Sequence, residues 1–540
     1  MATANRAPET AQAVALAFKS LGVRNLFGIP GGGSSVDLIE ACAAEGIPFI
    51  LVQHETSAAI MALVSGELTD SCGACISIMG PGATNLAAGA TYAYLERHPL
   101  LCITECYGPV SAPLMSIQKI DHPGLFAPFS KGSVAIDQTN AGRQIEDAVR
   151  MAVAERPGPF HIDLPNDPAM DGEWIPMPEA GPARQIGDVE AIAEAIDRAE
   201  KPLLIVGPVV GRQGAGDRVL SIAEKLQMAV MVTSKARGVV PEEHPLYTGV
   251  MSGVYKDGTF EERIVNQSDL VIAVGLDRME LLSPWLYAQP LIAIDAIEIP
   301  VEDRVGRPLL EASGPLNNLL KSLEIGLRPR TTWDTGAIRR FWDEALARLG
   351  AGSTDLNAAS LLVRARELAP ADTIVASEAG VYGRVGLYAW KVPDPSTALD
   401  SSGANTMGYS VPAVIAAALT RPAQKAVGLV GDGGFLMRAS ELETAARLGV
   451  APIFIVFDDA TLGMIRIKQQ SKGYERLGVD LAQTDFARLA ESFGGRGWEV
   501  RTLDEFDTAF KAALSSDRLE VIDARLDPAV YASHIAHIRG

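Results

Sequence analysis

The sequence is poor in positive charge and has no long hydrophobic run. Its 47 lysine and arginine residues are outnumbered by 66 aspartate and glutamate residues, which gives a net charge of −19, and no basic stripe is present. This charge balance argues against nucleic acid as a partner. The longest uncharged stretch, residues 71–95, contains Gly80-Pro81-Gly82 and predicts a strand, a loop and a helix, not a membrane span. The N-terminus lacks the basic and apolar segments of a signal peptide, so we expect a cytoplasmic protein with no membrane partner.

Cysteine is also scarce. The five cysteines all lie within the first 106 residues. Cys72 and Cys75 form a CxxC pair, but neither a second pair nor a thioredoxin-like context accompanies them, which argues against a redox or metal site. Cys75 opens an apolar run, so we interpret these thiols as small side chains packed near a strand.

Short-period repeats and low-complexity segments are absent as well, which excludes solenoid and disordered architectures. A chain of 540 residues is too long for one hydrophobic core, and 48% hydrophobic with 21% charged residues is ordinary for an α/β enzyme. We predict an α/β protein with three doubly wound parallel-sheet domains, over residues 1–182, 183–335 and 350–540. A proline-rich linker, residues 166–182, ends the first domain.

The most informative stretch lies between residues 426 and 464. An apolar run, residues 426–430, stops at Gly431-Asp432-Gly433-Gly434, and a helix-like segment follows and ends at Gly449. A second apolar run, residues 452–457, then stops at Asp458-Asp459. In a parallel βαβ unit both turns lie at the carboxyl edge of the sheet, where open α/β sheets bind ligands.

The two turns have complementary chemistry. Glycines in the first turn let backbone amides approach an anion at a helix N-terminus. A carboxylate such as Asp432 fits beside a bound phosphate if a hard divalent cation such as Mg²⁺ bridges the two, and Asp459 offers a second oxygen ligand. A Gly-Asp-Gly triplet alone also forms ordinary turns, but the strand context and the second acidic turn favour a cation site.

Three further turns lie in the predicted first domain. Residues 30–35 form a Gly-rich loop that is neither a Walker loop nor GxGxxG, and we interpret it as a loop where a substrate or cofactor approaches the backbone. Glu55 follows an apolar run and enters an Ala-rich helix, where a carboxylate is also favoured simply by the helix dipole. Gly80-Pro81-Gly82 follows another apolar run, and Asn85 is placed to cap the next helix.

Together these motifs resemble the thiamine diphosphate-dependent 2-oxo acid decarboxylase and carboligase family, in its acetolactate synthase-like branch, over nearly the whole chain. That family carries a glutamate in an HExxA element, a GPGxxN turn, and Gly-Asp-Gly followed after a spacer by Asn-Asn. The resemblance implies a pyrimidine-binding domain, a central Rossmann-like domain and a diphosphate-binding domain, in this order. It also implies thiamine diphosphate and Mg²⁺ as cofactors.

For the metal, the resemblance implies ligation by the side chains of Asp432 and Asp459 and by the carbonyl of Thr461. This chain departs from the family because Asp458-Asp459 stands where Asn-Asn is usual. We expect the added negative charge to weaken cofactor binding or to make binding more dependent on the metal.

For the cofactor ring, the resemblance implies that Glu55 hydrogen-bonds N1′ of the aminopyrimidine and so favours the tautomer that generates the thiazolium ylid. Met407 would prop the cofactor into its bent shape. The carbonyl of Asn405, where the family usually has glycine, would face the 4′-amino group. The other cofactor contacts implied are Gly80, Asn85, Gly380, Val381, Tyr382, Gly433, Gly434, Gly463 and Met464.

The assignment to a branch depends on Pro30-Gly31-Gly32, Gly463-Met464, Gln118 and Lys131. The resemblance places Gln118 and Lys131 in the substrate channel as catalytic candidates, although either residue also fits a surface position. Acetolactate synthases carry a tryptophan near the position of Ile467-Lys468, and that tryptophan is missing here. Their Arg-Phe-Asp-Asp run is missing too, so we expect no FAD in the central domain.

We therefore expect a lyase or transferase that decarboxylates a 2-oxo acid and ligates the resulting enamine to a second carbonyl. The paired-histidine motif of simple pyruvate decarboxylases is absent, which favours ligation. The alternatives are a non-ligating decarboxylase of the benzoylformate or oxalyl-CoA type, and a non-catalytic relative, against which Glu55 argues. A Rossmann dehydrogenase lacks support because no dinucleotide fingerprint is present. In this family the cofactor site lies between two subunits, so the expected partner is a second copy, in a homodimer or homotetramer.

Overall fold

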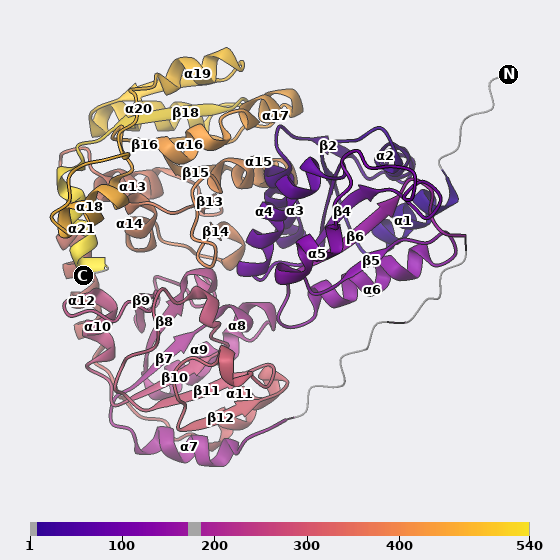
Figure 1. Cartoon of the computed structure of the whole chain (residues 1–540). Helices are drawn as coiled ribbons and strands as arrows, with labels where there is room; N and C mark the ends of the chain where they lie inside the picture. The colour runs from indigo at the N-terminus through magenta and orange to yellow at the C-terminus, as the bar shows by residue number, and fades with distance from the viewer. Residues whose placement is uncertain (1–7, 171–175, 177–184, 539–540) are drawn as a thin grey trace. The chain divides into compact units, whose positions relative to one another are not determined.

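Three parallel sheets organise the part of the chain that the structure, a computed structural model, describes: residues 8–170, 176 and 185–538. Each sheet has six strands, neighbouring strands run parallel, and helices flank the sheets (Figure 1). The prediction of an α/β fold with three parallel sheets is confirmed. Most of the predicted linker, residues 166–182, lies outside the described residues.

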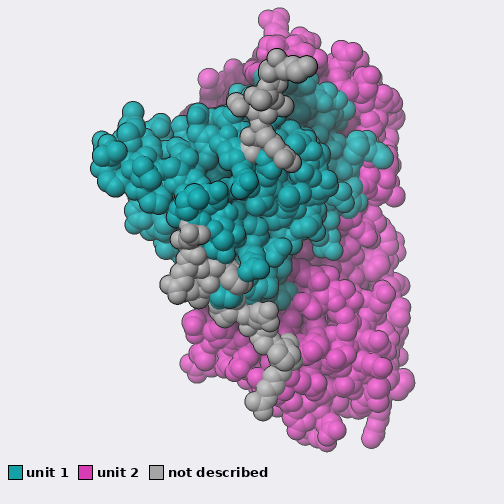
Figure 2. Space-filling model, turned by 90° about the vertical axis from the view of Figure 1, so that its right-hand side faces the viewer, with its two compact units in different colours: residues 1–180, 411–423, 438–452 teal, residues 181–410, 424–437, 453–540 magenta. Residues whose placement is uncertain are grey.

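The chain divides into two compact units, which are coloured teal and magenta in Figure 2. Unit 1 comprises residues 1–180, 411–423 and 438–452, and it contains the first sheet. Unit 2 comprises residues 181–410, 424–437 and 453–540, and it contains the second and third sheets.

The first sheet has the strand order β2-β1-β3-β4-β6-β5. Helix α3 is buried along nearly its whole length, because its small side chains allow α4 to pack closely on it. At the contact, a Cβ on Gly89 of α4 would collide with Ala59 of α3. The strands are β1 (Leu26–Gly28), β2 (Phe49–Leu51), β3 (Gly73–Ser77), β4 (Leu100–Cys106), β5 (Ser133–Ala135) and β6 (Pro159–Pro165), and the helices are α1 (Glu9–Ser20), α2 (Ser34–Ala44), α3 (Glu55–Thr69), α4 (Pro81–Leu95), α5 (His122–Phe126) and α6 (Ala141–Val153).

The second sheet has the order β12-β11-β10-β7-β8-β9, which is the 3-2-1-4-5-6 order of a Rossmann fold read from its other edge. Its strands follow the apolar runs of the sequence, since a parallel sheet covered on both faces needs apolar side chains on both. They are β7 (Pro202–Val206), β8 (Ala229–Thr233), β9 (Tyr247–Met251), β10 (Leu270–Val274), β11 (Leu291–Asp295) and β12 (Leu310–Ser313), with helices α7 (Val189–Arg198), α8 (Pro208–Arg212), α9 (Gly216–Leu226), α10 (Phe260–Val265), α11 (Leu316–Gly326) and α12 (Thr335–Arg348).

The third sheet has the order β14-β13-β15-β16-β18-β17. Counted from its own first strand this is 2-1-3-4-6-5, the same order as in the first sheet. Its strands are β13 (Ile374–Ser377), β14 (Ala398–Asp400), β15 (Ala426–Gly431), β16 (Ile453–Asp458), β17 (Arg496–Val500) and β18 (Glu520–Arg525). Its helices are α13 (Ala358–Leu368), α14 (Val381–Ala389), α15 (Ser410–Thr420), α16 (Asp432–Arg438), α17 (Glu441–Leu448), α18 (Gly463–Ser471), α19 (Phe486–Ser492), α20 (Leu503–Leu514) and α21 (Tyr531–Ile538), some of whose residues belong to unit 1.

One local prediction needs correction. The Gly431–Gly434 stretch is not a loop ahead of a helix, because β15 ends at Gly431 and α16 begins at Asp432 itself. The predicted single helix is also two helices, α16 and α17. The second of these ends, as predicted, at Gly449, which adopts a left-handed conformation with φ +64°.

The cysteines are free thiols, and all except Cys106 are buried. Burial raises the pKa of Cys72 and Cys75 well above the usual thiol range, which makes these side chains unreactive. None of the described helices has the length and apolarity that a membrane crossing requires.

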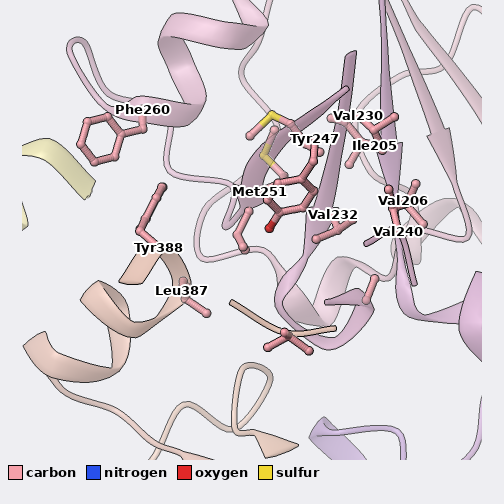
Figure 3. Close-up of a cluster of buried hydrophobic side chains, with 14 of the residues drawn as sticks. Ile205, Val206, Val230, Val232, Val240, Tyr247, Met251, Phe260, Leu387 and Tyr388 are labelled. Carbon is pink, nitrogen blue, oxygen red and sulfur yellow. The ribbon is translucent and has the colours of Figure 1, made fainter. Parts of the chain in front are cut away.

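A continuous hydrophobic core fills unit 2. Figure 3 shows its part around β7, β8 and β9, with Tyr247 and Met251 facing the valines of the neighbouring strands. Phe260 of α10 lies beside Tyr388 of α14, with ring centroids 5.1 Å apart, and beside Phe341 of α12, at 6.2 Å. The second and third sheets therefore share one core.

We predict that Phe260→Ala lowers the free energy of unfolding by about 3–5 kcal/mol, because it leaves a cavity among packed aromatic rings. Phe260→Leu keeps much of the buried volume and should cost less than about 1.5 kcal/mol. Urea denaturation followed by circular dichroism measures both changes. Equal midpoints for Phe260→Ala and the wild type would contradict this account of the core.

Candidate active site

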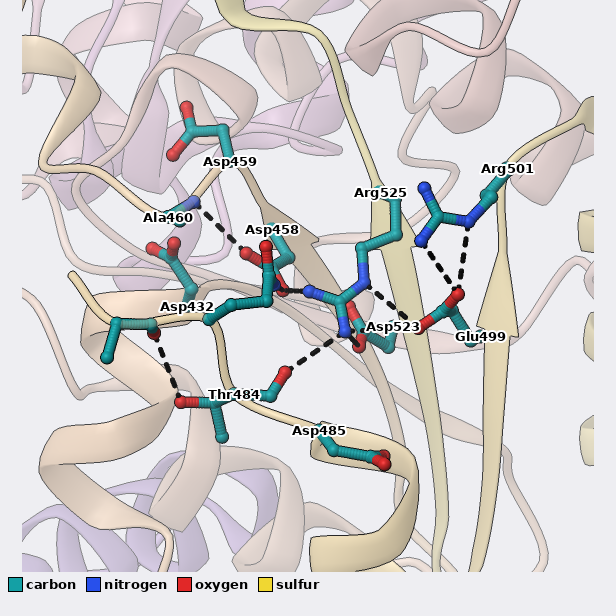
Figure 4. Close-up of polar contacts among 12 residues, drawn as sticks. Asp432, Asp458, Asp459, Ala460, Thr484, Asp485, Glu499, Arg501, Asp523 and Arg525 are labelled. Atoms are coloured by element: carbon teal, nitrogen blue, oxygen red, sulfur yellow. Dashed lines mark hydrogen bonds and ion pairs between the residues drawn. The ribbon is translucent and has the colours of Figure 1, made fainter. Parts of the chain in front are cut away.

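Two carboxylates lie at the carboxyl ends of adjacent strands in unit 2. Asp432 follows β15, and Asp459 follows β16, whose register pairs Gly431 with Phe457 (Figure 4). One carboxylate oxygen of Asp432 accepts the Gly433 amide at 2.6 Å. Its other oxygen is buried and has no hydrogen-bond partner among the described residues.

Burial and neighbouring carboxylates disfavour charge on both groups. Burial, followed by the charge of Asp459, raises the pKa of Asp432 to about 7. Burial also raises the pKa of Asp459 to about 6. A divalent cation between them would remove both penalties. The oxygen donors present, two carboxylates and the nearby carbonyl of Thr461, are those that Mg²⁺ prefers.

The glycines beside Asp432 leave room that a side chain would fill. A Cβ on Gly433 would lie 2.9 Å from the terminal methyl of Met407. A Cβ on Gly434 would overlap a carboxylate oxygen of Glu378. Met407 therefore lies against Gly433.

The acidic turn itself has a constrained backbone. Ala460 has φ +52°, a left-handed conformation, and its amide donates to a carboxylate oxygen of Asp458 at 3.1 Å. The amide of Thr461 donates in the same way to Asp459, also at 3.1 Å. The carbonyl of Thr461 accepts the Gly463 amide at 2.9 Å and keeps a second lone pair for a cation.

The charge of Asp458, the first aspartate of this turn, is compensated by an arginine. Asp458 forms an ion pair with the partly buried guanidinium of Arg525 on β18 and accepts a hydrogen bond from Gln483 at 2.9 Å (Figure 4). Arg525 also lies 2.7 Å from a carboxylate oxygen of Asp523 and 3.2 Å from one of Glu499. Asp458 carries a negative charge that the usual asparagine would not have. The ion pair with Arg525 compensates this charge.

The structure explains the other departure at this site as well. Asn405 has φ +45°, a conformation in which asparagine is the common alternative to glycine. Its side-chain oxygen accepts a hydrogen bond from Arg384 at 2.5 Å. An asparagine can therefore replace the usual glycine without changing the backbone.

The remaining predicted residues of unit 2 surround the same two turns. Tyr382 is buried at the start of α14, and its ring stacks on Phe457 with centroids 4.6 Å apart. Gly380 and Val381 immediately precede it. Gly463 begins α18, where a Cβ would lie 3.3 Å from Asp459, and Met464 packs on the core.

Glu378 is a residue that the sequence reasoning did not select. It is buried, accepts the Ser410 amide at 2.9 Å, and has its pKa raised to about 7 by burial. Glu378 directly follows the buried strand β13. The sequence pattern of an acidic residue after an apolar run could therefore have identified it.

Unit 1 holds a second group of predicted residues. Glu55 begins α3, is buried, and accepts a hydrogen bond from the side chain of Asn85 on α4 at 2.9 Å. Gly80 ends the turn after β3, and α4 begins at Pro81; a Cβ on Gly82, in the first turn of this helix, would lie 3.3 Å from the other Glu55 carboxylate oxygen. The structure thus brings Glu55, Gly82 and Asn85 together, and Asn85 lies within α4 instead of capping it. His54 instead caps α3 by accepting the Thr56 amide.

The two channel candidates differ in their surroundings. Gln118 has φ +56°, and its carbonyl oxygen would lie 2.5 Å from a Cβ on Gly80, so its backbone packs against that turn. The ammonium of Lys131 donates to the carbonyls of Ala154 and Arg156 at 2.5 and 3.0 Å. Burial lowers the pKa of Lys131 to about 8. Lys131 is therefore tied to the loop after α6.

The Gly-rich loop before α2 binds a carboxylate side chain of the same chain, that of Glu105. The carboxylate of Glu105 accepts the amides of Gly33 and Ser35 at 3.1 and 2.9 Å, and the Ser35 hydroxyl at 2.5 Å. A Cβ on Gly31 would overlap this carboxylate. The approach of a substrate or cofactor to this backbone was predicted, but Glu105 occupies the loop.

Comparison with known protein families matches three consecutive domains. Residues 8–122 match the thiamine pyrophosphate enzyme N-terminal TPP binding domain, residues 189–322 the central domain, and residues 378–524 the C-terminal TPP binding domain.

Curated relatives match nearly the whole chain. A probable acetolactate synthase large subunit of Methanocaldococcus jannaschii is 30% identical over 96% of this chain and 92% of its own length. The acetolactate synthase isozyme 2 large subunit of Escherichia coli is 30% identical over 96% and 95%. A probable 2-ketoarginine decarboxylase of Pseudomonas aeruginosa is 28% identical over 95% and 93%.

We predict that Asp432→Asn stabilises the protein by about 1 kcal/mol or more when divalent cations are absent, because it removes one of two buried like charges. The same change should abolish the stabilisation that Mg²⁺ and thiamine diphosphate give together. Thermal unfolding with and without these ligands measures both effects, with the exposed Asp517→Asn as control. An unchanged response to Mg²⁺ in Asp432→Asn would rule out this cation site.

We predict that Arg525→Met destabilises the protein by about 3–5 kcal/mol, since it leaves the carboxylate of Asp458 buried without its cation. In the double variant Asp458→Asn/Arg525→Met part of this loss should be recovered. Chemical denaturation of the wild type, both single variants and the double variant gives the coupling energy. Additive effects of the two substitutions would show that the pair is not coupled.

Proposed function

Because the chain belongs to the thiamine pyrophosphate enzyme family, we propose that it decarboxylates a 2-oxo acid with thiamine diphosphate and Mg²⁺ and joins the remaining fragment to a second carbonyl compound. The observation that carries the proposal is the buried carboxylate oxygen of Asp432, which lacks a hydrogen bond and faces a second acidic turn. A cation-bridged diphosphate explains both features.

In this proposal the two turns of unit 2 bind the metal and the diphosphate. Asp432 and Asp459 hold Mg²⁺ by their side chains, and Thr461 holds it by its carbonyl. Gly434 would bring its backbone amide to the phosphate oxygens, and Gly433, whose amide already donates to Asp432, would leave room for them. The remaining contacts with the cofactor are those of Gly380, Val381, Tyr382, Asn405, Met407, Gly463 and Met464.

Unit 1 supplies the proton chemistry. Bound thiamine diphosphate would supply the electron sink that lets CO₂ leave a 2-oxo acid. Glu55 would hold a proton between its carboxylate and N1′ of the aminopyrimidine, since one of its oxygens already accepts from Asn85 and the other faces the Gly82 turn. The Gly80–Gly82 backbone and Asn85 would position the ring. Gln118, which packs on Gly80, and Lys131 are the candidates for contacts with the substrate.

One observation favours a second candidate function, decarboxylation without ligation. Lys468 is exposed on α18, near the position where acetolactate synthases carry tryptophan, and a probable 2-ketoarginine decarboxylase is among the relatives. An acceptor pocket without that aromatic wall would hold a second carbonyl less firmly. Product analysis decides between the two functions.

We further propose a homodimer or homotetramer in the cytoplasm, with sites at the subunit interface and without FAD. Exposed apolar side chains between β4 and α5 support a partner surface, because Leu114 and Ile117 are 82% and 65% exposed. The free thiols are consistent with a reducing compartment. The three sheets support domains over residues 1–182, 183–335 and 350–540.

The test is Glu55→Gln, which keeps the shape of the side chain but removes its charge. We expect thiamine diphosphate to bind with a dissociation constant within about tenfold of wild type, while CO₂ release from 2-oxo acids falls by about 10²–10⁴-fold. The exposed Glu40→Gln serves as control. A screen of 2-oxo acids, with CO₂ and ligated product both quantified, accompanies the comparison.

The outcomes separate the alternatives. Ligated product supports the synthase-like function, and aldehyde with CO₂ supports the decarboxylase. Cofactor binding with neither product in the wild type would indicate a non-catalytic relative. Full activity of Glu55→Gln would refute the role of this carboxylate.

A further inference from the structure

A chain of polar side chains, buried except for the exposed Ser133 at its end, is linked to Gly80 in unit 1. Strand register creates it: Thr104 on β4 is paired with Asp163 on β6, and Ser133 on β5 is paired with His161 on β6. His161 and Asp163, two residues apart on one strand, point to the same face of the sheet. His122, the first residue of α5, reaches this face from above.

The contacts are short and continuous. His122 Nδ1 lies 2.8 Å from Asp163 Oδ1, and the Thr104 hydroxyl lies 2.8 Å from the same oxygen. His161 Nε2 lies 2.9 Å from the Thr104 hydroxyl, and His161 Nδ1 lies 2.6 Å from the Ser133 hydroxyl. The other nitrogen of His122, Nε2, accepts the backbone amide of Gly80 at 3.1 Å.

The donors and acceptors in these contacts determine which nitrogen or oxygen atom carries each proton. Because His122 Nε2 accepts from an amide, the proton of this imidazole is on Nδ1 and is donated to Asp163. The Thr104 hydroxyl must also donate to the Asp163 carboxylate, so His161 donates to Thr104 through Nε2. His161 Nδ1 then accepts from Ser133. A neutral His161 fits its surroundings, since burial lowers its pKa to about 4.

This arrangement excludes two other roles. His122 cannot act as a general acid, because its Nε2 already holds the Gly80 amide. The atoms of His122, His161 and Asp163 are close enough to hold a metal ion, all within 4.8 Å of one another. However, each of them has a donor or acceptor partner within the chain, so the group is complete without a cation.

The Gly80 turn is the place where the residues proposed for the cofactor ring meet. On one side, Gly82 lies against the Glu55 carboxylate, which Asn85 also holds. On the other side, the Gln118 backbone packs on Gly80. Gly80 has φ +68°, and glycine can adopt many backbone conformations. A hydrogen bond from outside the turn is therefore needed to define the conformation of Gly80.

We propose that His122 is a positioning residue, which fixes the Gly80–Gly82 turn through the Gly80 amide and ties it to the Asp163–Thr104–His161–Ser133 chain. Only the functional consequence of this contact rests on the proposed function. That consequence is that the turn is held where Glu55 and the cofactor ring require it. The hydrogen bond itself belongs to the protein without cofactor.

Two variants separate the two nitrogens of His122. The glutamine amide of His122→Gln reaches about as far as Nε2, so it can accept from Gly80 but loses the donor to Asp163. The shorter asparagine amide of His122→Asn coincides with Nδ1, so it keeps the donor to Asp163 but cannot reach Gly80. His98→Gln, which removes another buried histidine of unit 1 at the far end of α4, is the matched control.

The first readouts use the protein without cofactor. In wild type labelled with ¹⁵N at its seven histidines, one imidazole should show the Nδ1-protonated tautomer and disappear from the spectrum of both His122 variants. In hydrogen exchange, the peptide containing Gly80 should exchange about fivefold or more faster in His122→Asn, and at nearly the wild-type rate in His122→Gln and His98→Gln. Thermal unfolding should place both His122 variants within a few degrees of each other.

The catalytic readout follows. We expect kcat to fall about tenfold or more in His122→Asn and less than about threefold in His122→Gln, with little change in the KM of the 2-oxo acid. Equal losses in both variants, or unchanged exchange at Gly80 in His122→Asn, would overturn the proposal. So would stoichiometric zinc in the purified wild type that both variants lose. If the wild type fails to bind thiamine diphosphate, the proposed function fails, while the exchange and tautomer results still decide the role of His122.

Discussion

The burial of two carboxylates at the ends of adjacent parallel strands is the constraint on which the rest of the site depends. Charge on Asp432 and on Asp459 is disfavoured in this position: burial and then the charge of Asp459 raise the pKa of Asp432, and burial together with the charge of Asp458 raises the pKa of Asp459. The neighbouring features serve this arrangement. Glycines keep side chains out of the space beside Asp432. Arg525 forms an ion pair with Asp458 and so compensates the additional negative charge of that residue near the site. This concentration of buried acids supports the proposal that the site binds a divalent metal.

The first and third sheets present their turns at equivalent positions. Both have the strand order 2-1-3-4-6-5, so each has a switch point between its first and third strands, where open α/β sheets bind ligands. The Gly80–Gly82 turn follows the third strand of the first sheet, and Asp432 follows the third strand of the third sheet. One topology, used twice, thus supplies a turn for the proposed ring of the cofactor and a turn for its diphosphate. The second sheet, with its Rossmann order, holds neither turn.

The sequence predicted the features that are local and missed those that depend on register. The apolar runs at residues 426–430 and 452–457 lie within one residue of β15 and β16, because buried parallel strands are apolar runs bounded by turns. Asp432 and Asp459 could be selected because each directly follows such a run. The partner of Asp458 could not be, since Arg525 reaches it only across the pairing of β16 with β18. Glu105 in the Gly-rich loop and His122 under Gly80 were missed for the same reason. The residue roles assigned by resemblance stay predictions.

Calorimetric titration of the cofactor-free protein with thiamine diphosphate, in the presence of Mg²⁺ and again in the presence of a chelator, tests the central claim most directly. If Asp432 and Asp459 form a cation site for the diphosphate, binding is saturable with Mg²⁺ and is lost or greatly weakened with the chelator. Binding of equal strength under both conditions would show that the two carboxylates do not hold a metal. Absence of binding with any divalent metal would contradict the assignment of this protein as a thiamine diphosphate-dependent enzyme.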